Sequence, residues 1–143
     1  MPVPRIGSIA CAQALALWLG GAAAQTAVTG PASAPAAAPS LAATSALIGR
    51  WVRPDGGYVI TIRSVDAAGK IDAGYANPGP LPFYSAEAKR EGGQTRLYFE
   101  LRAGGYGGST YRLSYDAVSD RLVGVYYQAV ARQSYDVFFE RAK

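Results

Sequence analysis

The sequence predicts an all-β protein, and three observations lead to that prediction. Between residues 47 and 143, apolar and polar side chains alternate in eight short runs, as they do along strands with one buried face. Turns rich in Gly, Pro, Asn and Asp separate the runs, and no segment has the period of an amphipathic helix. All ten Tyr lie on or between these runs. Because short connections favour antiparallel neighbours, we predict an eight-stranded up-and-down barrel, with an open β-sandwich as the alternative.

Turn residues set the boundaries of the first four runs. The sequence Pro-Asp-Gly-Gly at 54–57 is a tight turn, and Gly69 marks a hairpin. The sequence Asn-Pro-Gly-Pro at 77–80 is expected to break the sheet, because proline has no N–H to donate to a strand ladder. The first four strands are therefore predicted at 47–53, 58–65, 71–75 and 83–90.

Turns also delimit the second half of the domain. One with two Gly lies at 91–94, and a longer loop with four Gly lies at 104–108; the turn at 116–121 has no Gly but begins with Asp116 and contains Asp120. The run 122–130 is apolar at both odd and even positions, so the sequence leaves open which of its side chains face inward. The last four strands are predicted at 97–102, 111–115, 122–130 and 135–140.

The alternation assigns an uncharged set of side chains to the interior. An eight-stranded barrel can be filled by such side chains or can hold one small ligand, and both alternatives stay open. If there is a ligand, tyrosines would bind it, because each offers an apolar ring and a hydroxyl. The candidate ligand-binding residues are Tyr58, Tyr75, Tyr84 at the rim, Tyr111, Tyr115 and Tyr135. The inward set is Trp51, Tyr58, Ile60, Ile62, Ile71, Ala73, Tyr75, Leu97, Phe99, Leu101, Tyr111, Leu113, Tyr115, Tyr135, Val137 and Phe139.

The N-terminal part predicts export. Residues 1–24 have the features of a signal peptide: Arg5 in the first segment, a short apolar core, and small residues at Ala22 and Ala24 before the cleavage site. Residues 25–46 are rich in Ala and Pro and uncharged, which predicts a disordered linker, although 40–46 could form one helical turn. We therefore expect a bacterial periplasmic or secreted protein with no membrane span after cleavage, whose folded domain is 47–143.

The residue types present restrict the chemistry. The chain has no His, and its one Cys, Cys11, lies in the signal peptide, so catalytic triads and zinc sites of the usual kind are excluded from the mature protein. We expect no cofactor, no metal and no enzyme activity; a hydrolase with two carboxylates is the remaining catalytic alternative, but Glu87 and Glu100 fall on outer or rim positions. The net charge of +4 is scattered, which argues against a nucleic-acid partner.

Gly49-Arg50-Trp51 at the start of the first strand matches the Gly-x-Trp start of lipocalins and, more loosely, of avidins. The rest of the domain, with GGYVITI, NPGP, GGSTYRLSYD, DRLVGVYYQAV and YDVFFER, resembles a family of small exported bacterial β-barrel proteins of unknown function. The calycin-type resemblance implies an eight-stranded barrel in which Trp51 packs at the closed end against an arginine near the last strand, here Arg141. It thus implies structural roles for Gly49, Trp51 and Arg141.

Two functional hypotheses follow from these patterns. The first is a lipocalin-like binding or accessory module for a small apolar or aromatic ligand or an envelope component. The second is a solid barrel that binds an envelope polymer or protein through its loops at 77–82 and 104–109, with Tyr106 and Asn77 as the interacting residues. The oligomeric state stays open.

Overall fold

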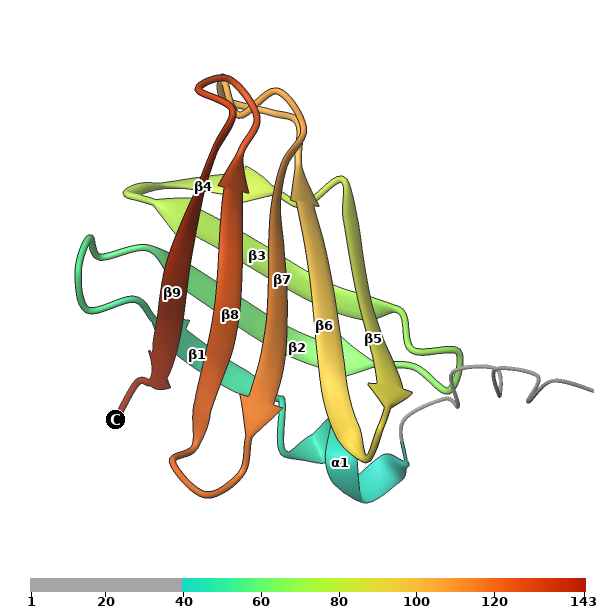
Figure 1. Cartoon of the computed structure of the whole chain (residues 1–143). Helices are drawn as coiled ribbons and strands as arrows, with labels where there is room; N and C mark the ends of the chain where they lie inside the picture. Colours follow the sequence, from blue (N-terminus) through green and yellow to red (C-terminus); the bar gives the residue numbers. More distant parts are fainter. Residues whose placement is uncertain (1–39) are drawn as a thin grey trace, which may run out of the picture. The chain divides into compact units, whose positions relative to one another are not determined.

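Nine antiparallel strands form a single sheet in the computed structural model, which describes residues 40–143 (Figure 1). Their order in the sheet is β4-β3-β2-β1-β9-β8-β7-β6-β5. The short helix α1, Leu41–Ser45, precedes the strands β1 Gly49–Val52, β2 Val59–Val65, β3 Ile71–Asn77, β4 Gly79–Pro82, β5 Ser85–Glu91, β6 Gln94–Leu101, β7 Ser109–Asp116, β8 Arg121–Gln128 and β9 Gln133–Arg141.

The sheet curls into a half-barrel. The short strand β1 pairs with β2 on one side and with β9 on the other, so it joins the two layers seen in Figure 1. Where β3 approaches β5, a bridge links Lys70 to Glu87, and the Ala88 N–H donates to the Gly69 carbonyl at 2.7 Å. Within residues 40–143 the edge strands β4 and β5 do not pair. The all-β prediction is therefore confirmed, whereas eight strands in a closed barrel is wrong.

The ninth strand is β4, in the segment where the sequence predicted a break. It forms a tight hairpin with β3, in which Pro80 lies opposite Ala76 and Pro82 lies opposite Gly74. Both prolines are tolerated because β4 is an edge strand, so their missing N–H groups remove no bond to a further strand. The prolines thus lie in the edge strand where the sheet ends, and they do not prevent that strand from pairing with β3.

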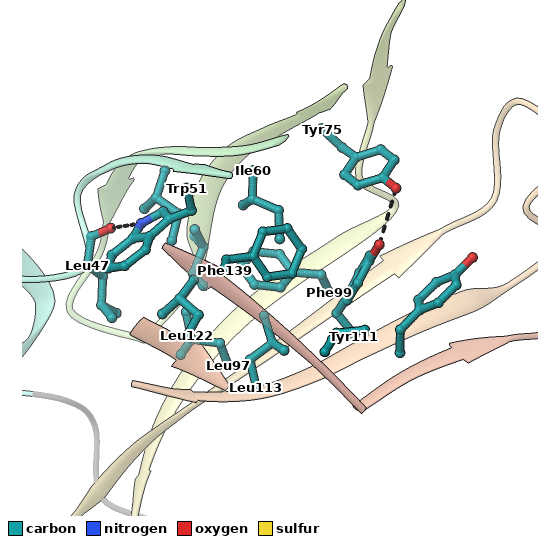
Figure 2. Packing of buried hydrophobic residues seen from close by; sticks show 14 of the residues in the cluster. Leu47, Trp51, Ile60, Tyr75, Leu97, Phe99, Tyr111, Leu113, Leu122 and Phe139 are labelled. Atoms are coloured by element: carbon teal, nitrogen blue, oxygen red, sulfur yellow. Dashed lines mark hydrogen bonds between the residues drawn. The ribbon is translucent and has the colours of Figure 1, made fainter. Parts of the chain in front are cut away.

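The core lies between the two layers and contains most of the side chains that the alternation assigned to it (Figure 2). It also contains Leu47, Ala88, Leu122 and Tyr126, which that set did not include. Most of that set is buried, but Tyr58, Ala73 and Tyr115 are half-buried and Tyr135 is 40 % exposed. The open question at β8 is also answered, since Leu122 and Tyr126 point inward. The exposed apolar residues of β8 and β9 on the other face are Val123, Val125, Tyr127 and Phe138.

One end of the half-barrel is covered by α1 and the residues that follow it. Leu47 is fully buried, and its carbonyl accepts a hydrogen bond of 2.8 Å from Trp51 Nε1 (Figure 2). Residues 41–45 lie in the segment predicted to be a disordered linker, but they are helical, in agreement with the alternative of one helical turn. The predicted signal peptide and the rest of the linker lie outside the described residues.

Arg141 makes several contacts at the end of the half-barrel that α1 covers. Its guanidinium carbon lies 4.2 Å from the centre of the Trp51 ring, and it donates hydrogen bonds to the carbonyls of Ala46 and Ile48 and to both carboxylate oxygens of Asp120. A Cβ at Gly49, whose φ is +145°, would lie 2.6 Å from Arg141 Nη1. The structure thus brings together the three residues to which the calycin resemblance gave structural roles.

Candidate functional site

A row of aromatic rings crosses four neighbouring strands at one level. Phe99 on β6 is opposite Tyr111 on β7, which is opposite Tyr126 on β8, which is opposite Tyr135 on β9. The ring centres of Tyr111 and Tyr126 are 4.5 Å apart, and those of Tyr126 and Tyr135 are 6.3 Å apart, with the planes nearly parallel in both pairs. Exposure rises from zero at Tyr111 to 7 % at Tyr126 and 40 % at Tyr135. The row therefore begins in the core and ends at the surface.

Tyr75 on β3 connects this row to the opposite layer. Its hydroxyl lies 3.2 Å from that of Tyr111 (Figure 2). Its ring meets the Tyr106 ring edge to face, with the ring centres 5.7 Å apart. Burial raises the pKa of both core tyrosines, that of Tyr111 to about 12. Tyr75 and Tyr111 are thus neutral core residues that support the rings above them.

These raised pKa values predict alkaline destabilisation. Above pH 10 the unfolded chain loses protons that folded Tyr75 and Tyr111 keep, so the stability that these two tyrosines contribute is fully present below pH 10 and is lost as the pH rises toward 12. The slope approaches about 1.4 kcal/mol per pH unit for each tyrosine. Urea unfolding between pH 8 and 11 measures it. Tyr111→Phe should reduce the slope, Tyr84→Phe at an exposed ring serves as the control, and a flat profile would contradict the prediction.

An open cleft of about 680 Å³ lies where this row reaches the surface. Four segments that are distant in the sequence form its walls: the β1–β2 turn, the β3–β4 hairpin, the glycine-rich loop between β6 and β7, and the adjoining ends of β8 and β9. Within residues 40–143, the side chains that give the cleft its chemical character are Arg53, Tyr58, Asn77, Leu81, Tyr106, Ser109, Tyr126, Gln128 and Tyr135.

The glycine-rich loop holds Tyr106 in the cleft wall. The four glycines of the loop all have positive φ, so the chain can turn sharply on both sides of the tyrosine. Asn77 Nδ2 donates to the Tyr106 hydroxyl at 2.7 Å, and Ser109 Oγ donates to the Tyr106 carbonyl at 2.5 Å. The two loop residues that the sequence singled out are therefore bonded to each other.

Arg53 supplies the charged group of the cleft. Its Nε and Nη2 donate to the two carboxylate oxygens of Asp55 at 2.5 and 2.7 Å, and its guanidinium carbon lies 4.4 Å from the centre of the Tyr58 ring. The bond with Asp55 raises the pKa of Arg53 and lowers that of Asp55, so both partners stay ionised at neutral pH. The Arg53 side chain is 12 % exposed, whereas that of Asp55 is 61 % exposed.

The structure divides the candidate ligand-binding tyrosines into three groups. Tyr58 and Tyr135 line the cleft, as do the loop candidates Tyr106 and Asn77. Tyr75 and Tyr111 are buried in contact with the lining rings. The other two are placed elsewhere, with Tyr84 62 % exposed beneath Arg102 and Tyr115 bonded to Asp120 at the α1 end.

Sequence reasoning missed Arg53, Tyr126 and Gln128. Arg53 follows Trp51 by two residues and shares its face at the end of the first predicted strand, but only uncharged side chains were assigned to the interior. Tyr126 and Gln128 belong to the run 122–130, for which the sequence did not show which side chains face inward. The pairing of β8 with β7 and β9 determines this.

The carboxylates of the described chain do not gather at the cleft. None of its lining residues is Asp or Glu, and Glu87 and Glu100 lie outside it, in contact with Lys89 at 3.5 Å and Arg102 at 2.6 Å, respectively. Residues 40–143 contain no group of three His, Cys, Asp or Glu side chains that could hold a metal ion. In the same range, no helix is long and apolar enough to cross a membrane.

Comparison with known proteins gives no match: no family model, no curated protein and no solved structure is significantly similar to this chain. The cleft must therefore be interpreted from its own chemistry.

Proposed function

We propose that this protein is a lipocalin-like binding module, exported to the periplasm or secreted, that holds a small ligand or a part of an envelope component in the tyrosine-lined cleft. The observation that supports this most strongly is the cleft itself, an open space of about 680 Å³ into which an aromatic row emerges from the core. Small-molecule sites are typically concave, of this volume, and lined by aromatic rings with a few placed polar groups.

The architecture supports the proposal because contacts with neighbouring residues hold several lining side chains in place. The rings of Tyr111 and Tyr126 are stacked within the sheet, and Tyr106 is held from both sides by Asn77 and Ser109. A site preorganised in this way loses little conformational entropy when a ligand binds. The proposal that the protein is exported rests on the predicted signal peptide and not on the cleft.

The alternative is an interaction protein that uses its loops. The bond of 2.7 Å between Asn77 and Tyr106 favours it, because it joins the two loops into one rim. In this function a protein or polymer would contact the rim from outside, and the cleft would hold no separate small molecule.

Mass spectrometry distinguishes the two functions. The full chain, purified from the envelope fraction of its source organism, is compared under native and denaturing conditions. We expect a small mass that is lost on denaturation, because the cleft is preorganised for a ligand. It should be present in the wild type and in Tyr84→Ala, at a ring outside the cleft, and absent in Tyr135→Ala. Bare protein in all three samples would contradict the binding module and favour the loop interaction.

A further inference from the structure

We propose that the ligand of the cleft is a neutral sugar residue of a glycan; this inference rests on the proposed function and specifies its ligand class. Three properties of the cleft lead to it: flat aromatic surface, polar groups spread around the walls, and charge that is already balanced. The aromatic surface and the balanced charge argue against a charged ligand, and the polar groups argue against a wholly apolar one.

The aromatic surface suits the face of a sugar ring. Tyr135 is 40 % exposed, whereas Tyr126, which stacks against it at an angle of 22°, is 7 % exposed, so the Tyr135 ring provides the exposed apolar surface at the mouth of the row. One face of a pyranose carries C–H groups, whose slightly positive hydrogens pack well on the negative face of an aromatic ring. A strongly charged ligand without an apolar face would leave this surface unused.

The polar groups argue against a wholly apolar ligand. Besides the tyrosyl hydroxyls, Arg53, Asn77 and Gln128 contribute hydrogen-bonding atoms from different walls of the cleft. A hydrocarbon would remove these groups from water without replacing their hydrogen bonds, which costs free energy at each of them. A sugar carries hydroxyls around its whole edge and can meet donors and acceptors on several sides at once.

The charge argues against an anionic ligand. Among the lining residues of the described chain, Arg53 is the only charged one, and Asp55 already accepts two hydrogen bonds from it. An anion would have to displace the exposed Asp55 carboxylate or remain close to it. A neutral diol instead finds a planar donor and a planar acceptor side by side, because the pair lies at the rim with Asp55 61 % exposed.

The experiment is a calorimetric titration of the full chain with defined probes. The neutral probes are cellotriose, maltotriose and triacetylchitotriose; trigalacturonic acid is the anionic counterpart, and N-phenyl-1-naphthylamine, followed by fluorescence, is the apolar one. We expect at least one neutral trisaccharide to bind with one-to-one stoichiometry and at least tenfold more tightly than trigalacturonic acid. Tyr135→Ala should weaken that binding at least tenfold, whereas Tyr84→Ala should change it less than twofold.

A second variant, Tyr135→Phe, keeps the experiment decisive if Tyr135→Ala does not fold. Tyr135→Phe keeps the ring, so binding should remain within about threefold of the wild type if the ring face carries the contact. If the naphthylamine or the anionic sugar binds in a Tyr135-dependent manner and no neutral sugar does, the sugar inference is overturned while the binding module stands. If no probe binds, the sugar inference is overturned, and the mass-spectrometric comparison decides about the binding module.

Discussion

A Gly124→Ala variant is expected to lose about 3 kcal/mol or more of its free energy of unfolding, or not to fold at all. A Cβ at this position would lie 2.1 Å from the carbonyl oxygen of Arg112 and 2.9 Å from the Cα of Leu113, both of which are backbone atoms of the neighbouring strand β7. A side chain could rotate away from such a contact, whereas here β7 and β8 would have to separate. Glycine in a strand often marks such a close approach of another backbone.

The matched control is Gly79→Ala. Gly79 is also a strand glycine, but a Cβ there meets nothing within 4 Å, and the residue lies on the edge strand β4. Its replacement should change the free energy of unfolding by less than about 1 kcal/mol, with stabilisation possible through the reduced entropy of the unfolded chain. Urea unfolding of both variants measures the difference. Equal effects at the two positions would show that the close approach at Gly124 relaxes at little cost.

Gly124 also shows where prediction from the sequence ended. In strands with a clear alternation, such as β6 with Leu97, Phe99 and Leu101, the pattern alone identified the buried face, because only one parity was apolar. The run 122–130 is apolar at both parities, and its inward face is decided by pairing with β7 and β9. That information is non-local, and so is the contact that requires glycine at 124.

The number of strands was mispredicted for a similar reason. Pro80 and Pro82 cannot donate to a ladder, which is a local property that the sequence states correctly. The missing N–H groups exclude a strand only where a neighbouring strand on each side needs them. β4 has β3 on one side and no strand on the other. The same sequence in the middle of the sheet would have broken it.

The candidate site was predicted in part, because alternation gives the face of a side chain but not its level along the barrel. Tyr58, Tyr115 and Tyr135 were all assigned to the inner face, yet Tyr58 and Tyr135 reach the cleft while Tyr115 packs against Trp51 at the other end, with ring centres 6.0 Å apart. The level depends on strand stagger and tilt, which follow from the register of all the strands together. The loop residues Tyr106 and Asn77 both line the cleft, because a glycine-rich loop and a strand end both lie at its rim.

At the end covered by α1, Arg141→Ala is expected to lower the free energy of unfolding by about 2–4 kcal/mol. The guanidinium satisfies the carbonyls of Ala46 and Ile48 and the carboxylate of Asp120 while it packs on the Trp51 ring, so its removal frees several acceptors and one ring face together. Arg141→Lys should recover only a small part of this loss, because an ammonium cannot direct planar donors to three acceptors at once.

Arg121→Ala provides the comparison for a surface arginine on the adjacent strand. Arg121 pairs with Glu140 at 2.6 Å, but both side chains are close to half-exposed, so its removal should cost less than about 1 kcal/mol. A loss in Arg141→Ala no larger than that in Arg121→Ala would mean that Arg141 acts as an ordinary surface charge. If the larger loss is found while ligand binding at the cleft is unchanged, the two ends of the half-barrel have separate tasks: the Arg141 end stabilises the fold, and the tyrosine end binds.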